Sequence, residues 1–69
     1  MRSVSGKELC RIVERHGWEL KRVRGSHHVY AKPGIPVILT IPVHSGRDLK
    51  KGTLGAILRL AGLTAEDLE

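Results

Sequence analysis

Three short β-type segments follow one another in the middle of this chain, joined by turns so tight that they favour antiparallel pairing. The segments are expected over residues 18–24, 27–32 and 37–41, with Gly25-Ser26 in the first turn and Pro33-Gly34-Ile35-Pro36 in the second. A helical pattern lies on each side of them, so the order of elements is α-β-β-β-α. The sequence therefore predicts an α+β domain in which three strands form an antiparallel meander.

The three segments differ in how their apolar residues alternate. In the first, Trp18 and Leu20 share one face while Val23 falls on the other, which predicts a β-bulge. The third is β-branched and apolar, which is typical of a central, well-buried strand, and Pro42 is expected to end it. In the second, a period of two places His27, Val29 and Ala31 on one face and His28, Tyr30 and Lys32 on the other.

The flanking helices carry their own start and stop signals. Residues 5–16 are expected to form the first helix, with Ser5 and Glu8 as a capping box. Residues 50–61 are expected to form the second, which Gly62 stops before a short helical tail. Because the apolar stripes of both helices need a surface to pack on, we expect them to cover one face of the sheet and to leave the other face to solvent or to a partner.

The composition fits one small domain, residues 1–69, with a basic surface. A chain of this length buries only about 60% of the surface that its unfolded form exposes, so the core is thin. Twelve Lys and Arg against seven Asp and Glu give a net charge of +5, and eleven of the twelve lie within residues 1–51. That part of the chain can face a polyanion such as nucleic acid. Two aromatic residues are too few for stacking platforms of the RRM or OB type.

The single cysteine excludes an internal disulfide and leaves Cys/His zinc sites short of ligands. It favours a reducing, cytoplasmic location. No run of about 18 apolar residues predicts a membrane span, and the first residues do not form an apolar signal segment. We expect no cofactor, no metal and no membrane among the partners.

The most informative segment is the turn Gly25-Ser26 with the two histidines, His27 and His28, that follow it. Arg22 and Arg24 lie just before the turn, so an imidazole is placed among cations that suit phosphate. Scission of RNA requires the ribose 2′-hydroxyl to lose a proton, attack the adjacent phosphorus and expel the 5′-oxygen. Histidine titrates near neutral pH, and one positioned general base contributes roughly 10²–10⁴-fold. No metal is needed, because the nucleophile belongs to the substrate. The residues alone leave open whether this histidine pair cleaves RNA, contacts it without cutting, or only packs on the sheet.

The other two histidines carry weaker signals. His16 lies on the inner stripe of the first helix and is interpreted as a partly buried structural residue. His44 lies in the loop of residues 43–49, where it either contacts a phosphate or a partner, or is an ordinary loop residue. A metal site made from His27, His28 and His44 is disfavoured, because neighbouring strand residues point to opposite faces.

The start of the second helix is an independent signal. Lys50 and Lys51 are expected in its first turn, where the macrodipole disfavours cations by roughly 0.3–1 kcal/mol each. Gly52 adds a cost of up to about 1 kcal/mol. Free helix amides and two ammonium groups suit a phosphate. Phosphate binding is therefore one explanation for these unfavourable residues at the start of the helix. The alternatives are a solvated basic turn, and a Gly52 that permits close packing against a strand.

These segments together resemble the HicA family of bacterial and archaeal toxins, small mRNA interferases of type II toxin–antitoxin pairs. The resemblance spans roughly residues 5–63 and is carried by segments 17–18, 22–30, 42–44 and 48–54, and by Leu58, Ala61, Gly62 and Leu63. It implies a fold like that of double-stranded-RNA-binding domains, metal-independent endoribonuclease activity on mRNA, and a HicB-type antitoxin that occludes the site. It also implies that His27 is the catalytic histidine, as base or as acid. The expected RNA-binding set is Arg22, Arg24, Gly25, Ser26, His28, Lys50 and Lys51.

Two other functions remain open at this point. One is a non-catalytic double-stranded-RNA-binding module of the same fold. The other is a protein-interaction subunit whose basic face serves an acidic partner chain.

Overall fold

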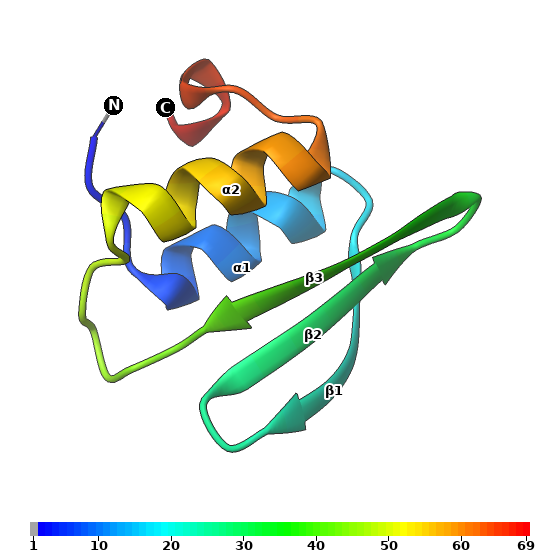
Figure 1. The fold of residues 1–69 in the computed structure, drawn as a ribbon, viewed down its shortest axis with the longest axis horizontal. Coiled ribbons are helices and arrows are strands. Elements are labelled where there is room, and N and C mark those ends of the chain that lie inside the picture. Colours follow the sequence, from blue (N-terminus) through cyan, green and yellow to red (C-terminus); the bar gives the residue numbers. More distant parts are fainter. Residues whose placement is uncertain (1) are drawn as a thin grey trace.

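The element order is the expected α-β-β-β-α arrangement with a short helical tail (Figure 1). The structure, a computed structural model, describes residues 2–69. Its helices are α1 (Gly6–Arg15) and α2 (Lys51–Ala61), and its strands are β1 (Glu19–Arg24), β2 (His27–Lys32) and β3 (Ile35–Pro42). A 3-10 turn, η1 (Ala65–Leu68), follows α2. The strands pair antiparallel in the order β1-β2-β3, which confirms the α+β meander.

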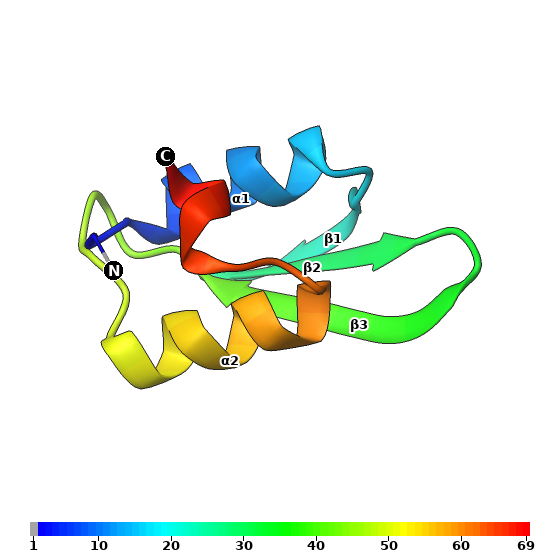
Figure 2. The same ribbon diagram turned by 90° about the horizontal axis from the view of Figure 1, so that it is seen from above.

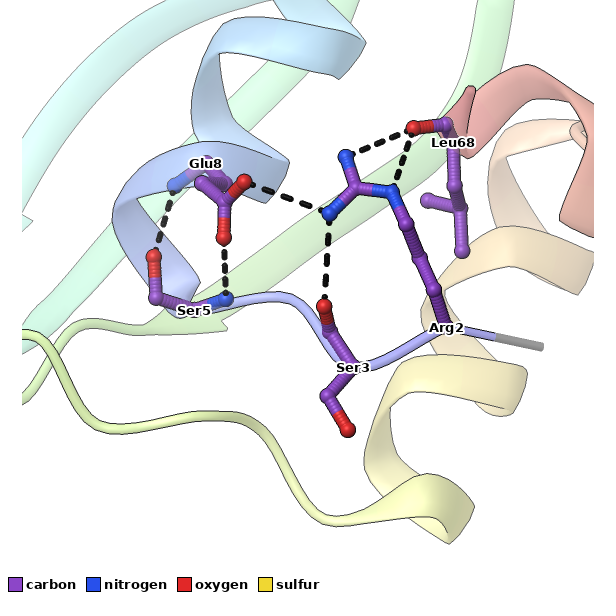
Figure 3. A network of polar contacts seen from close by, with 5 residues as sticks. All are labelled: Arg2, Ser3, Ser5, Glu8 and Leu68. Atoms are coloured by element: carbon purple, nitrogen blue, oxygen red, sulfur yellow. Dashed lines mark hydrogen bonds and ion pairs between the residues drawn. The ribbon is translucent and has the colours of Figure 1, made fainter.

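The capping box of α1 forms as predicted. The Glu8 amide donates to the Ser5 hydroxyl and the Ser5 amide donates to the Glu8 carboxylate, each over 3.1 Å. The guanidinium of Arg2 contacts the same carboxylate and donates two hydrogen bonds to the Leu68 carbonyl oxygen, at 2.6 and 2.9 Å (Figure 3). This network ties η1 to the beginning of α1.

Both helices lie on the same side of the sheet, as expected, and η1 lies between them in the view of Figure 2. From β2 and β3, Tyr30, Leu39 and Ile41 are fully buried on this side, within the same core as apolar residues of α1 and α2. The other side of the sheet has no helix over it. We name it the open face, and it includes every second residue of the strands.

The prediction that residues 37–41 form a central, well-buried strand is wrong. The central strand is β2, and β3 is an edge strand with alternating burial. Leu39 is fully buried, whereas Ile38 is 54% exposed. Helices cover only one face of the sheet, so the apolar residues that point to the open face stay in water. β3 also begins at Ile35, which leaves Pro33-Gly34 as the whole of the second turn.

The predicted β-bulge in β1 is confirmed. The register of β1 against β2 shifts between Leu20 and Arg22. Leu20 therefore lies opposite Tyr30, and Val23 lies opposite His28, on the side of the helices. The same shift places the arginines of β1 on the open face.

Candidate functional site

His27 lies in a row of three residues at one end of the open face. It is the Cα partner of Arg24 in β1 and of Pro42 in β3. Directly opposed residues in an antiparallel sheet share a face, so the three side chains are neighbours. The His27 side chain is exposed, and the next row inward brings Arg22 opposite Val29. The imidazole is therefore open to solvent, with Arg24 directly opposite it on β1 and Arg22 one row further along the same face.

The arginines of this face carry uncompensated charge. The ion pairs found among residues 2–69 join Arg2 to Glu8, His16 to Asp67 and Lys21 to Glu19. Neither Arg22 nor Arg24 has an acidic partner within that part of the chain, and both are exposed. This end of the sheet is thus prepared to receive an anion.

The turn before His27 has the shape that its sequence requires. Gly25 adopts φ +59°, in the left-handed region that glycine tolerates best. The carbonyl oxygen of Ser26 accepts a hydrogen bond of 2.7 Å from the Val43 amide. That bond joins the turn to the chain that leaves β3, and it fixes His27 relative to the loop ahead of α2.

A pocket of about 300 Å³ opens between the end of β3 and the start of α2. It is lined by Pro42, His44, Arg47, Asp48, Leu49, Lys50 and Thr53. Since Pro42 belongs both to this pocket and to the row of His27, the two are adjacent. The loop that forms the pocket is held by a 2.8 Å hydrogen bond from the Leu49 amide to the Val4 carbonyl oxygen, and by a β-bridge between Asp48 and Ser5.

The two lysines at the start of α2 differ in position. Lys50 is the N-cap, with extended backbone and no capping hydrogen bond from its side chain, and it lines the pocket. Lys51 is the first helical residue and is exposed, but it does not line the pocket. The suggestion that Gly52 permits close packing is wrong, because a Cβ at Gly52 would meet no atom within 4 Å.

The close approach occurs instead at Gly6, which the sequence pattern did not reveal. A Cβ there would lie 2.0 Å from the Pro42 carbonyl oxygen. The one hint in the sequence was a glycine directly after the N-cap of a helix. The backbone at this position is helical and does not need glycine's flexibility, so the absence of a side chain is the remaining reason for a glycine there. The first turn of α1 thus packs directly beneath Pro42, the neighbour of His27.

His28 is separated from His27 by the sheet itself. It is half-buried on the side of the helices, opposite Val23 and Ile41. Two predicted site residues therefore lie apart from the others: His28, on the side of the helices, and Lys51, outside the pocket. Among residues 2–69, no three His, Cys, Asp or Glu side chains are grouped so as to hold a metal ion.

His16 has the structural position that its place on α1 suggested. Its Nδ1 lies 2.9 Å from the Ile12 carbonyl oxygen, and its Nε2 lies 3.5 Å from the Asp67 carboxylate. The ring therefore links α1 to η1.

Tyr30 and Cys10 are buried in the core, where the pKa values of both side chains are raised. Burial raises the pKa of Tyr30, and the neighbouring Cys10 thiol and Glu14 carboxylate raise it further. The Tyr30 hydroxyl donates a 2.5 Å hydrogen bond to Glu14. Burial likewise raises the pKa of the Cys10 thiol. Neither group is suited to act as a nucleophile near neutral pH.

Comparison with known proteins identifies the family. Residues 6–63 match the model of the HicA toxin of bacterial toxin–antitoxin systems. A search of curated proteins finds no match. Within residues 2–69, neither helix has the length and apolar character needed to cross a membrane. Because the family match covers most of the chain, the protein belongs to the HicA toxin family, and its role is that of a toxin whose partner is an antitoxin.

Proposed function

We propose that this toxin is an endoribonuclease that cleaves mRNA, with His27 as its catalytic histidine. The observation that carries the proposal is the exposed position of His27 beside Arg24 on the open face. A proton-transfer group open to solvent and flanked by cations is what cleavage by the 2′-hydroxyl requires.

The reaction is a transesterification within the RNA. The 2′-hydroxyl gives up its proton and its oxygen attacks the adjacent phosphorus, while the bond from phosphorus to the 5′-oxygen breaks. His27 either takes the proton from the 2′-hydroxyl or gives one to the 5′-oxygen. The guanidinium groups of Arg22 and Arg24 stabilise the added negative charge on the phosphorus centre. The products are a 2′,3′-cyclic phosphate and a 5′-hydroxyl.

The RNA backbone is held by Arg22 and Arg24 on the sheet and by Lys50 and Lys51 at α2. Gly25 and Ser26 shape the turn that presents His27, and the Ser26 hydroxyl is available to a phosphate oxygen. We assign no step to His28, because it lies on the other side of the sheet from His27. We infer that the antitoxin is of the HicB type and blocks the open face, and that the toxin acts on mRNA in the cytoplasm.

The test compares the parental chain with His27→Ala on a labelled RNA in the presence of EDTA. We expect the parental chain to cut the RNA, and His27→Ala to bind it with similar affinity and leave it whole. Cleavage by His27→Ala at the parental rate would refute the assignment of this residue. A parental chain that shifts the RNA on a native gel without cutting it would identify a non-catalytic RNA-binding module instead.

A further inference from the structure

The proposed cleavage moves two protons, and His27 accounts for one of them. One group must accept the proton of the 2′-hydroxyl, and another must donate a proton to the 5′-oxygen as it leaves. If the proposed function holds, on which this inference rests, the second group must lie on the same side of the sheet as His27, within reach of the same phosphate.

The hydrogen-bonded ladder between β2 and β3 continues past the end of the strands. Pro42 is opposite His27, and the next residue, Val43, donates its amide to Ser26 over 2.7 Å. Val43 packs against the core on the side of the helices. β3 ends at Pro42, but if the alternation of its side chains is carried on through Val43, His44 falls on the side of Pro42 and His27. The observed exposure of His44 and its place beside Pro42 in the pocket agree with this.

This placement indicates how far apart the backbones of His27 and His44 lie. His44 is two residues beyond the cross-strand partner of His27, which is a diagonal relation in an antiparallel ladder. Diagonal neighbours have Cα atoms about 7–8 Å apart, within reach of long or ring-bearing side chains. Two imidazoles whose Cα atoms are related in this way can reach the same phosphodiester, one at the 2′-oxygen and the other at the 5′-oxygen.

The charges around His44 favour a phosphate in the same place. Arg47 and Lys50 line the pocket with it, and Asp48 is the one acidic side chain among the residues that do so. The ion pairs of residues 2–69 include neither Arg47 nor Lys50. Arg24 does not line the pocket, but it lies opposite His27 in the row that ends at Pro42, so it adds a cation from β1 on the same face.

We propose that His44 is the second proton-transfer group of the site, and that Arg47 and Lys50 bind the RNA phosphate at the pocket. One imidazole begins neutral and takes the 2′-hydroxyl proton as the new bond between the 2′-oxygen and phosphorus forms. The other begins protonated and gives its proton to the 5′-oxygen as the bond to phosphorus breaks. The two rings end with exchanged protonation states, and exchange with water restores them.

The experiment uses two RNA oligonucleotides that differ in one atom, the bridging 5′-oxygen or a sulfur in its place at the cleaved linkage. A thiolate leaves without being protonated, so the sulfur substrate does not need the general acid. We measure single-turnover cleavage of both by the parental chain, His27→Ala and His44→Ala. His16→Gln is the matched control, because it removes an imidazole that the fold places on α1, against η1.

On the ordinary RNA, we expect His44→Ala to lose roughly 10²–10⁴-fold in cleavage rate, the range for one acid–base group. We expect its RNA affinity and urea unfolding midpoint to stay close to the parental values, and His16→Gln to cleave normally. On the sulfur substrate, we expect one of the two alanine variants, and not the other, to recover most of the parental rate. The variant that recovers identifies the general acid.

If His44→Ala cleaved ordinary RNA at the parental rate, the role of His44 would be overturned and the proposed function would stand. If both alanine variants, or neither of them, recovered the parental rate on the sulfur substrate, the assignment of His27 and His44 as an acid–base pair would be overturned in the same way. A rate loss that is matched by weaker RNA binding would reduce His44 to a binding residue, which contradicts the proposal. Failure of the parental chain to cut either substrate would instead overturn the proposed function itself.

Discussion

The contact between α1 and the end of β3 supports the site from beneath and can be tested by adding one methyl group. Gly6 is buried, and a Cβ at this position would lie 2.0 Å from the Pro42 carbonyl oxygen and 3.0 Å from the Pro42 carbonyl carbon. Both atoms belong to the backbone, so rotating a side chain cannot relieve the clash. In Gly6→Ala, either α1 or the end of β3 must move.

The expected cost follows from two opposing effects. Overpacking in a close-packed interior destabilises by about 1–3 kcal/mol. Replacing glycine by alanine in a helix gains up to about 1 kcal/mol, and less at the first helical position. We therefore expect a net loss of about 1–2 kcal/mol, which lowers the Tm of a domain this small by roughly 4–8 °C for each kcal/mol. Gly55→Ala is the matched control, because Gly55 lies inside α2 and an added Cβ would meet no atom within 4 Å.

Urea unfolding measures both variants, with the fluorescence of the buried Trp18 as the signal. We expect the urea midpoint to fall for Gly6→Ala and to rise for Gly55→Ala. For Gly55→Ala, the expected gain in the free energy of unfolding is about 0.5–1 kcal/mol. Because Pro42 lies opposite His27, Gly6→Ala should also slow RNA cleavage under folded conditions. A Gly6→Ala chain as stable as the parental one would refute the reasoning about this contact.

Two further predictions concern charge. The native chain holds the Tyr30 proton more tightly than the unfolded chain, because burial raises the pKa of this phenol. The free energy of unfolding should therefore fall as the pH rises above about 10, and Tyr30→Phe should make the fall shallower. Phenolate absorbance that develops at its ordinary pH in a folded chain would contradict this. For RNA binding, replacing Lys50 and Lys51 by alanine should lower the slope of log affinity against log salt by about 0.7 for each phosphate that is no longer neutralised. Arg59→Ala, at the far end of α2, is the control, and an equal effect of both changes would exclude a local phosphate site.

The arrangement around His27 was largely predictable from the sequence. Two-residue periodicity separated His27 from His28, and the disturbed alternation in β1 indicated the bulge that turns Arg22 and Arg24 to the open face. Both inferences depend only on local geometry. The capping box of α1 was predictable for the same reason, since Ser5 and Glu8 interact within one helical turn.

Features set by contacts between distant segments were not predictable. Nothing in the apolar run of β3 shows that it would lie at an edge of the sheet. The sequence does not distinguish an apolar residue that is buried in the core from one that is exposed to water. The glycine that permits close packing is Gly6 rather than Gly52, because the partner is the backbone of Pro42, 36 positions along the chain. The pocket around His44 likewise depends on how the loop is fastened to Val4 and Ser26.

The central claim is that the RNA supplies its own nucleophile at the site of His27. The most direct measurement compares a labelled RNA with the same oligonucleotide carrying a single 2′-deoxyribose on the 5′ side of the cleaved linkage. We predict that the parental chain binds both, leaves the modified linkage intact, and cuts the RNA to a 2′,3′-cyclic phosphate and a 5′-hydroxyl. Cleavage of the 2′-deoxy linkage, or a 5′-phosphate on the product, would contradict the account.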